Sequence, residues 1–429
     1  MGRLAEPAAP SGKVRREFMQ KGVDRRERIM RAAGTHFLKD GFERTSMDRI
    51  AASARVSKQA IYEHFRDKED LFDQVVRLDL APASVRDLSD RGDLFSTAVA
   101  AAETLFEAFV QPRNFGLFRA NIVATRRFPQ LAADLHDFRR SHSRTLGLYL
   151  EQQAQAGMIA PIEGNPVDLG TRLGGMSVEG ARYFLGYKPP AQAVRQLQAR
   201  LAAEVYCFGV GKAVVPAGLD PQPAYAPVLP EPPATVQMRM SAERFAALCD
   251  AAADEFLAHG FEGASLDAIA AATGVGRATI YRRFGGKAGL FAYVIEREIA
   301  AQWQDIAMPE GDTPLLRMER LCRIVLDLHL APRSLALYYL LVQESDQFPE
   351  LARRFYDMQI DRVARPLQRI VASAGMAPMA PALLRMFHTL AVFGVRYVVS
   401  LRAVDDAERA LVSRQAAAIF WQGISGPRT

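Results

Sequence analysis

The chain has 429 residues, which is long enough for two or three domains with their own hydrophobic cores. Its apolar (49%) and charged (24%) fractions are typical of a soluble globular protein. The three cysteines, Cys207, Cys249 and Cys322, lie far apart and form no Cys/His cluster, which argues against a disulfide framework and a zinc site.

The charge of the chain is uneven along the sequence. The net charge is +6, and residues 1–31 contribute nine basic and four acidic side chains. A basic arm ahead of a folded domain suits a polyanion such as DNA, although a solvated tail explains the same composition equally well. We therefore expect residues 1–21 to form a basic, disordered arm. Because these residues contain no apolar stretch, and residues 386–404 include His388 and Arg396, we expect neither a signal peptide nor a membrane span. The expected location is the cytoplasm.

Helical periodicity dominates the folded part of the chain. The stretch "RRERIMRAAGTHFLKDGF" (25–42) has apolar residues at i, i+3 and i+4 positions, and Gly41 is expected to end this helix. The next stretch, "TSMDRIAASAR" (45–55), opens with a Thr/Ser cap and predicts a short helix. Since no sustained period-2 stretch follows, the predicted fold class is all-α.

A second short helix, "SKQAIYEHF" (57–65), follows the first after only a few residues. This layout is typical of a helix-turn-helix, whose second helix enters the DNA major groove. Ile61 and Phe65 are expected to face inward because they lie four residues apart. The residues left outward or at the helix start are Ser57, Lys58, Gln59, Tyr62 and His64. Lysine reaches guanine acceptors, glutamine pairs with adenine, and tyrosine hydroxyls hold phosphates.

The helix-turn-helix occurs twice. Residues 37–72 recur as residues 256–291, with 17 of 36 positions identical and no gap. The similarity continues from 112–137 to 332–357 at an offset of 220, and from 180–185 to 394–399 at an offset of 214. Because this repeat is far longer than a solenoid repeat, it predicts a duplicated domain pair. Between the copies, residues 214–237 hold seven prolines and predict an extended spacer.

The segments "IAASARVSKQAIYEHFRDKEDLF" (50–72) and "IAAATGVGRATIYRRFGGKAGLF" (269–291) resemble the DNA-binding domain of the TetR family of transcriptional regulators. The shared pattern is a helix, a turn, an I/L-Y-x-x-F helix, and then a lysine and an L-F pair. The resemblance implies two tandem TetR-like units. Each has an N-terminal three-helix helix-turn-helix domain and a helical effector-binding and dimerisation domain.

The resemblance also implies roles for individual residues. In the first copy, the residues implied to contact phosphate are Thr45, Ser46, Tyr62 and Lys68, and those facing bases are Ser57, Lys58 and Gln59, with His64 on the outward side. In the second copy, they are Ser265, Tyr281 and Lys287 for phosphate and Arg277 and Thr279 for bases, on a helix made more basic by Arg282 and Arg283. Both copies are expected to bind DNA, and their different outward residues predict different half-sites.

Four positions depart from the family pattern. Arg55 stands in a turn where the second copy has the commoner Gly274, which is expected to strain or reshape the first turn. Gly276 replaces the usual Ser/Thr at the start of the second recognition helix, and Gly285-Gly286 replace the polar cap before Lys287. The change of cap costs only a few tenths of a kcal/mol because glycine is itself a tolerable N-cap.

Each copy continues with an apolar helical region. The resemblance implies a pocket there for a small, largely apolar effector. The candidate lining residues are Phe106, Phe118 and Ile122 in the first copy and Tyr338 and Leu341 in the second. A solid hydrophobic core explains the same residues equally well. His136 and His142 lie six residues apart, but we expect no metal and no cofactor.

Members of the family usually dimerise through the last two helices of each subunit. Here these correspond to roughly 166–187 with 189–211 and 380–401 with 405–424. A chain with both copies can form this four-helix bundle within itself, and the small residues Gly174, Gly175, Gly180 and Gly394 would allow close approach. We therefore expect an intramolecular pseudo-dimer, with further homodimerisation left open. Its recognition helices would lie ~34–36 Å apart, on an imperfectly palindromic operator.

The expected domains are a basic arm (1–21), a first helix-turn-helix domain (22–80), a first helical domain (81–213), a proline-rich linker (214–237), a second helix-turn-helix domain (238–300) and a second helical domain (301–429). The predicted function is a DNA-binding transcriptional regulator, by default a repressor released by its effector. A ligand-sequestering or protein-interaction module with a vestigial DNA-binding domain is the alternative. We expect no enzyme, because the chain has no G-x-S-x-G, P-loop or H-E-x-x-H motif.

Overall fold

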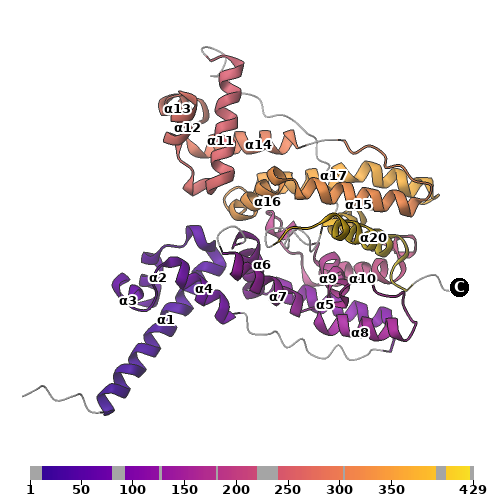
Figure 1. Ribbon diagram of the computed structural model, residues 1–429, viewed down its shortest axis with the longest axis horizontal. Coiled ribbons are helices and arrows are strands. Elements are labelled where there is room, and N and C mark those ends of the chain that lie inside the picture. Colours follow the sequence, from indigo (N-terminus) through magenta and orange to yellow (C-terminus); the bar gives the residue numbers. More distant parts are fainter. Residues whose placement is uncertain are drawn as a thin grey trace, which may run out of the picture. The chain divides into compact units, whose positions relative to one another are not determined.

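The computed structural model describes residues 12–79, 92–124, 128–179, 182–219, 240–302, 305–392 and 402–425. Every regular element within these ranges is a helix, which confirms the predicted all-α class. The chain divides into two compact units, residues 1–81 and residues 82–429 (Figure 1).

The first unit contains one helix-turn-helix domain. Its helices are α1 (Gly12–Arg44), α2 (Met47–Ala54), α3 (Lys58–Tyr62) and α4 (Lys68–Asp79). The apolar positions of the sequence pattern, such as Ile29, Phe37 and Ile61, form its core, and α1 packs against both α2 and α4. Gly41 leaves the helical conformation with φ 79°, so the first long helix breaks where the sequence predicted its end.

The second unit begins with the first helical domain. Its elements are α5 (Leu94–Val110), α6 (Pro112–Ala124), α7 (Pro129–Ser141), α8 (Arg144–Gln155), α9 (Pro166–Val178), the 3₁₀ turn η1 (Arg182–Phe184), α10 (Gln192–Phe208) and the 3₁₀ turn η2 (Val210–Lys212). Asp93 caps α5 by accepting a hydrogen bond from the amide of Ser96 at 2.8 Å. Helices α5, α9 and α10 pack against one another and bury Phe106, Leu173 and Tyr206.

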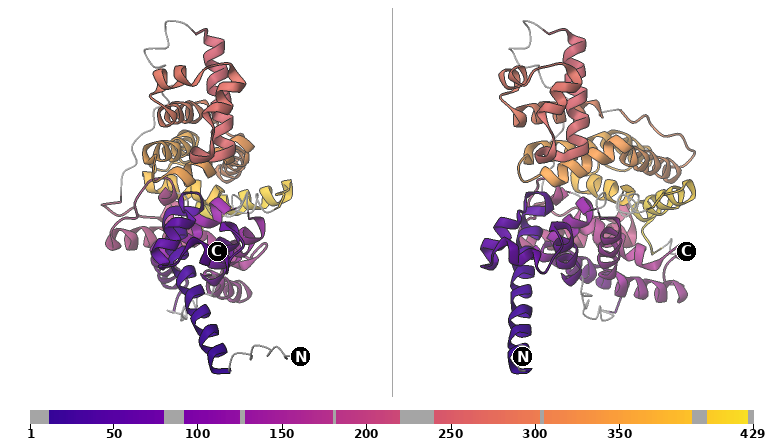
Figure 2. Two further views of the ribbon diagram at one scale, coloured as in Figure 1. Left: turned by 90° about the vertical axis from the view of Figure 1, so that its left-hand side faces the viewer. Right: turned by 60° about the vertical axis from the view of Figure 1, so that its left-hand side comes forward.

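The second helix-turn-helix domain lies in the same unit. Its helices are α11 (Ala242–Gly263), α12 (Leu266–Thr273), α13 (Arg277–Phe284) and α14 (Lys287–Ala301), which form the compact salmon bundle of Figure 2. Gly260 breaks α11 with φ 72°, as Gly41 breaks α1. The order of the four helices, and the packing of the first helix on the second and the fourth, therefore repeat those of the first unit.

The second helical domain completes the chain. Its helices are α15 (Pro314–Leu330), α16 (Pro332–Glu344), α17 (Pro349–Ser373), α18 (Pro381–Val392) and α20 (Asp406–Gln422). The long helix α17 replaces the separate helices α7 and α8 of the first copy. No single helix in the described ranges has the length and apolar character to cross a membrane. Among the described residues, only α15 and α16 taken together have that length and composition, and a 69° bend separates them.

The two helical domains contact each other within the second unit. Helix α9 packs on α18, and α10 packs on α20. Helices α10 and α20 are labelled next to each other in Figure 1. The ends of α10 and α20 cross at Gly209 and Gly423, where the amide of Ile424 donates to the carbonyl of Tyr206 at 2.9 Å. A Cβ atom at either glycine would lie 2.3 Å from a carbonyl oxygen of the other helix end, so both positions require glycine. Four other glycines were predicted from the sequence to allow the helices of the two halves to approach closely. Of these, Gly174 and Gly175 line a cavity instead, and Gly180 and Gly394 lie outside the described residues.

Buried charges also join the two helical domains. The carboxylate of Glu179, fully buried, accepts from Arg385 at 2.8 Å and from Arg182 at 3.1 Å. The hydroxyl of Tyr187 donates to Asp357 at 2.6 Å. The contacts of Glu179 with Arg385 and of Tyr187 with Asp357 fix the register between the halves, because each links a residue before 190 to one after 355.

The terminal arm and the linker fall largely outside the described residues. Residues 1–11 and 220–239 are not described, and the predicted boundaries within them stay predictions. Residues 12–21, which we assigned to the disordered arm, belong instead to α1.

Candidate DNA-binding sites and effector cavity

Three aromatic rings hold each helix-turn-helix domain in the same way. In the first copy, the ring centroids of Phe37, Phe42 and Phe72 lie 6.0, 5.1 and 5.1 Å apart, with one stacked and two edge-on pairs. In the second copy, the matching rings of residues 256, 261 and 291 lie 6.4, 5.0 and 5.2 Å apart with the same arrangement. The aromatic packing that positions both recognition helices is therefore conserved between the copies.

The first motif helix is capped identically in both copies. Ser46 accepts from the amide of Arg49 at 3.2 Å, and Ser265 accepts from the amide of Ala268 at 3.2 Å. The turn that follows is left-handed in both, with φ 54° at Arg55 and φ 64° at Gly274. Arg55 thus keeps the shape of the turn and carries the strain expected of a non-glycine residue there.

The second motif helix presents an exposed face in both copies. Ser57 caps α3 by accepting from the amide of Ala60 at 3.1 Å, whereas Gly276 supplies no side chain to cap α13. Lys58 and Gln59 are exposed on α3, and Arg277 and Arg282 are exposed on α13. Thr279 is only half-buried on α13.

Tyrosine occupies one matching position on each exposed face. Tyr62 is 47% exposed and Tyr281 is 50% exposed, which is unusual for so large a side chain. The phenol of Tyr281 also lies near Arg277, and their hydrogen bond is the largest cause of the raised pKa of that guanidinium. Both phenols are therefore accessible to a partner in solution.

The leading cation of each recognition helix forms the same ion pair. Lys58 Nζ lies 3.1 Å from Asp48 of α2, and Arg277 Nη1 lies 3.2 Å from Asp267 of α12. The two aspartates were not among the predicted site residues. Their matching positions in the repeat are the signal that could have found them. Because all four side chains are about half exposed or more, a phosphate or a base can compete for either cation.

Lysine opens the following helix in both copies and lies over an aromatic ring. Lys68 Nζ is 4.3 Å from the ring centroid of Phe42, and Lys287 Nζ is 5.2 Å from that of Phe261. Lys287 also donates to the carbonyl of Glu262 at 2.9 Å. These cation–π contacts hold each ammonium beside the start of the helix-turn-helix.

Three side chains do not lie where the outward pattern predicted. Thr45 is 1% exposed, and its hydroxyl donates to the carbonyl of Gly41 at 2.7 Å, so it is corrected from a surface contact to a buried one. His64 is half-buried, with Nε2 wholly covered. Arg283 is buried and approaches Met240 Sδ at 3.5 Å, so it does not add to the exposed basic face. His64 and Arg283 each lie three residues after an inward isoleucine, and this spacing could have identified them as inward-facing.

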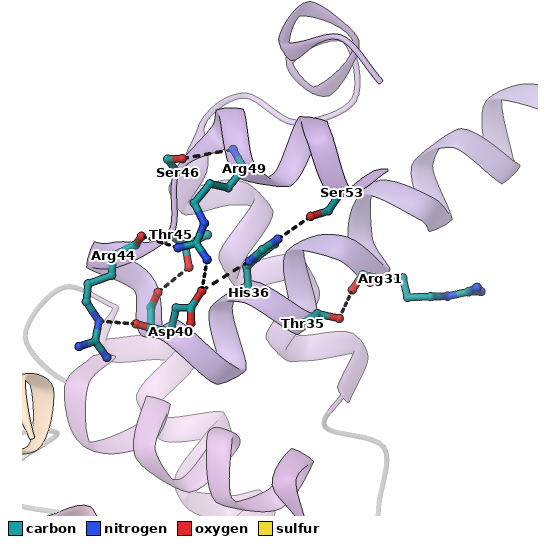
Figure 3. A network of polar contacts seen from close by, with 10 residues as sticks. Arg31, Thr35, His36, Asp40, Arg44, Thr45, Ser46, Arg49 and Ser53 are labelled. Atoms are coloured by element: carbon teal, nitrogen blue, oxygen red, sulfur yellow. Dashed lines mark hydrogen bonds and ion pairs between the residues drawn. The ribbon is translucent and has the colours of Figure 1, made fainter. Parts of the chain in front are cut away.

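A polar network braces α2 against α1 in the first copy (Figure 3). His36 Nε2 lies 2.7 Å from Ser53 Oγ, and Arg49 Nη2 donates to Asp40 at 2.8 Å. In the second copy the histidine and the acidic residue are exchanged, because Glu255 stands at the position of His36 and lies 3.7 Å from His259. Glu255 also accepts from the amide of Ser265 at 2.8 Å. In addition, Arg244 donates to the carbonyl of Gly274 at 2.6 Å and holds the turn, a role that the sequence did not reveal.

A cavity lies in the first helical domain. The empty space inside it, with the open solvent at its mouth included, is about 590 Å³. Its lining residues are Leu105, Ala108, Phe109, Phe118, Arg139, His142, Ser143, Thr171, Gly174, Gly175, Val178 and Phe184.

Of the five predicted effector-pocket residues, only Phe118 is among those that line this cavity. Phe106 faces a separate hollow with Glu107 and Arg195, and Ile122, Tyr338 and Leu341 are buried in the core. In the described ranges, no group of three or more His, Cys, Asp or Glu residues is arranged to hold a metal ion.

Family models match both motif regions and the second helical domain. Residues 29–75 and 248–294 match bacterial regulatory proteins of the tetR family, and residues 317–377 match the C-terminal domain of AefR-like transcriptional repressors. The repeat identified from the sequence therefore coincides with two matches to one DNA-binding domain.

Curated relatives match over a short part of the chain. The chain is 42% identical over 53 residues to the uncharacterized HTH-type transcriptional regulator YhgD of Bacillus subtilis (strain 168), and 38% identical over 63 residues to the HTH-type transcriptional regulator AcrR of Shigella flexneri. These matches cover 12% and 15% of the chain. The chain spans only 28% and 29% of the length of these relatives.

Solved structures of similar proteins each cover less than half of the chain. A TetR-family transcriptional regulator from Mesorhizobium loti MAFF303099 shares 25% identity with a TM-score of 0.36, over 43% of this chain and 95% of its own. The flavonoid-responsive regulator FrrA shares 24% identity with a TM-score of 0.33, over 42% of this chain and 93% of its own.

Proposed function

We propose that the chain is a sequence-specific, DNA-binding transcriptional regulator of the TetR family, because two of its regions match bacterial regulatory proteins of that family. The observation that carries the proposal is the repetition of one helix-turn-helix frame with an exposed recognition helix in both copies. Double-stranded DNA fits these helices, because each presents a cation and a half-exposed tyrosine on one face. The protein acts in the cytoplasm, where DNA is accessible to it.

The roles of the exposed residues follow from their chemistry. Lys58 and Gln59 of α3 and Arg277 of α13 read base edges, since lysine and arginine suit guanine and glutamine suits adenine. Phosphates are held by the remaining exposed or half-buried polar residues, namely Ser46, Tyr62, Lys68, Ser265, Tyr281 and Lys287. Because Gln59 is matched by Ala278, the two helices read different half-sites.

The two copies act as an intramolecular pseudo-dimer on one imperfectly palindromic operator. This part of the proposal is supported by the packing of α9 on α18 and of α10 on α20, which are the last helices of each copy. The reciprocal glycine crossing at Gly209 and Gly423, 214 residues apart, gives further support because a two-fold relation places equivalent residues opposite each other.

A small apolar effector releases the protein from DNA. The match to AefR-like repressors and the apolar cavity of the first half support a ligand-controlled repressor. A ligand that prefers one position of α6 lowers DNA affinity by its differential binding free energy.

A chain of contacts links the cavity to the second DNA-binding domain. Next to Phe118 of the cavity, Arg119 donates to the carbonyl of Val342 at 3.1 Å, near the end of α16. Two residues further, Glu344 accepts from the amide of Phe261 at 3.2 Å, directly after the break in α11. A movement of α6 can therefore be transmitted through α16 to the helix-turn-helix.

Gel-shift titration with the DNA upstream of the protein's own gene tests the proposal. We expect a complex at low salt whose affinity falls steeply as salt is raised. Tyr62→Phe and Tyr281→Phe should each weaken binding a few-fold on every sequence, because each removes one phosphate contact worth about 1 kcal/mol. Tyr149→Phe, in the helical domain, is the matched control and should have no effect. Absence of any complex at low salt would contradict the proposal and favour a ligand-sequestering protein.

A further inference from the structure

The cavity of the first half has a mostly apolar wall, in which Arg139, His142, Ser143 and Thr171 are the polar lining residues. The rings of Phe109 and Phe118 stack at 5.7 Å with 13° between their planes, and Phe184 lies edge-on to Phe109 at 5.5 Å. His142 lies edge-on to Phe118 at 5.8 Å, at the break between α7 and α8. The cavity therefore suits a small aromatic body with a polar group directed at this histidine.

The hydrogen-bonding state of His142 follows from its contacts. Its Nδ1 lies 3.0 Å from the carbonyl oxygen of Phe138, and because a carbonyl only accepts, Nδ1 carries the hydrogen. Burial lowers the pKa of His142, so the ring is neutral and Nε2 carries a lone pair. The side chain is 6% exposed, and Nε2 is buried with no hydrogen-bond partner among the described residues.

The lone pair of His142 Nε2 is a buried acceptor without a hydrogen-bond donor among the described residues. Leaving a buried polar atom without a partner costs about 1–3 kcal/mol, so native proteins rarely do so. A hydroxyl group on a bound aromatic molecule would supply the missing donor while its body fills the apolar space. A hydrocarbon of the same shape would leave Nε2 unsatisfied.

The matching place in the second half is filled by the protein's own side chains. At the offsets of the repeat, Gly174 corresponds to His388 and Phe109 corresponds to His329. These two imidazoles meet at 2.9 Å between their Nε2 atoms, and both are buried. The second half also lacks the helix break at which His142 lies, because α17 runs continuously from Pro349 to Ser373.

We propose that the first half alone carries the effector site, that it binds one hydroxyl-bearing aromatic molecule per chain, and that His142 Nε2 accepts the hydrogen bond of that hydroxyl. This inference rests on the proposed function only for the biological use of the site, because ligand binding can be measured without DNA. It assigns a stoichiometry and a ligand class to one half of a duplicated chain.

Calorimetric titration of the full chain without DNA tests the inference, with 2-naphthol as the probe and naphthalene and 2-methoxynaphthalene as analogues that lack a donor. We expect one 2-naphthol per chain, bound about tenfold more tightly than either analogue, because only 2-naphthol satisfies Nε2. In His142→Phe, which keeps an edge-on ring, this preference should vanish while the apolar analogues still bind. His259→Phe, an exposed histidine elsewhere, is the matched control and should retain the preference.

Each other outcome overturns the inference. Two 2-naphthol molecules per chain would place a second site outside the first half. Equal affinity for all three probes, no binding of any, or an unchanged preference in His142→Phe would remove His142 as the acceptor. If His142→Phe does not fold, the stoichiometry and the preference of the wild-type chain still decide. A failed gel shift would contradict the proposed function but leave this result intact.

Discussion

In the first helix-turn-helix domain, the side chains of His36, Asp40, Arg49 and Ser53 brace the motif, with His36 and Ser53 joined at 2.7 Å (Figure 3). In the second, Glu255 takes their place, and it contacts His259 at 3.7 Å and the amide of Ser265 at 2.8 Å. Yet the aromatic triads agree closely in their ring separations, and both turns are left-handed at φ 54° and 64°. Duplication has preserved the inward aromatic packing and let the polar bracing and the outward residues diverge.

The helical domains differ more than the DNA-binding domains do. The first has a break between α7 and α8, a glycine at position 174 and a cavity. The second has one continuous helix and a histidine pair in the corresponding place. The difference suggests that one half keeps a ligand site while the other supplies rigid packing.

The largest effect is expected where the two halves meet. Glu179→Gln removes the carboxylate that Arg182 and Arg385 share in the interior, so the free energy of unfolding should fall by about 3–5 kcal/mol. The substitution keeps the side-chain shape at a residue whose φ is already 53°, so backbone strain does not change. Urea unfolding of the full chain measures the loss.

An exposed ion pair provides the control for Glu179. Asp305 and Arg365 lie 3.3 Å apart with both side chains largely in solvent, and Asp305→Asn should change stability by less than about 0.5 kcal/mol. If Glu179→Gln costs no more than Asp305→Asn, the buried charges do not hold the halves together.

A smaller effect, on the pH dependence of stability, is expected at the contact between Tyr187 and Asp357, which also joins the two halves. Burial raises the pKa of Asp357 to about 6, against the hydrogen bond from Tyr187 and with help from the nearby charge of Asp361. Because this pKa lies above the value of about 3.9 in an unfolded chain, the folded state binds the proton more tightly. Asp357 therefore lowers the free energy of unfolding as pH rises from about 4 to about 6, by about 1–2 kcal/mol after screening.

Asp357→Asn should remove this contribution. The difference in the free energy of unfolding between variant and wild type, measured by urea unfolding at several pH values, should grow in favour of the variant between pH 4 and pH 6 and then level off. A difference that does not vary with pH would show that Asp357 ionises as freely in the folded chain as in the unfolded one.

The smallest effect is expected at the two turns. Gly274→Arg should destabilise the second motif by about 1 kcal/mol, since a side chain disfavours a positive φ while a Cβ there meets no atom closer than 3.5 Å. Arg55→Gly should stabilise the first motif by less than this, because glycine also adds freedom to the unfolded chain. Amide hydrogen exchange of α12 and α2 measures the two changes in local stability. If Gly274→Arg does not speed exchange in α12, or if Arg55→Gly speeds it in α2, the strain assigned to a side chain at these turns is contradicted.

Local patterns in the sequence were sufficient to predict the helices, the repeat and the exposed recognition faces. Ile61 and Phe65 are buried as their spacing required, and Ser46 and Ser57 cap helices as expected. Thr45 was misassigned because adjacent Thr and Ser can each serve as a cap, and only the fold decides which one turns inward. The contact of Glu179 with Arg385 joins residues 206 apart, and no local pattern encodes it.

The cavity was also beyond local prediction. Its existence depends on Gly174, on the break at His142 and on how rings from α5, α6 and η1 meet. The same apolar helices in the second half pack into a core, so composition alone did not separate pocket from core. The alignment of Gly174 with His388 was the signal that could have distinguished the two halves.

Selection of bound DNA from a random pool, with each motif altered in turn, tests the central claim most directly. The wild-type chain should select two different half-sites. Gln59→Ala should relax base preference in one half-site only, by about 1–3 kcal/mol at one position, and Arg277→Ala should do the same in the other. A perfect palindrome, or equal loss on selected and random DNA for both variants, would contradict the claim that one polypeptide reads two different sequences.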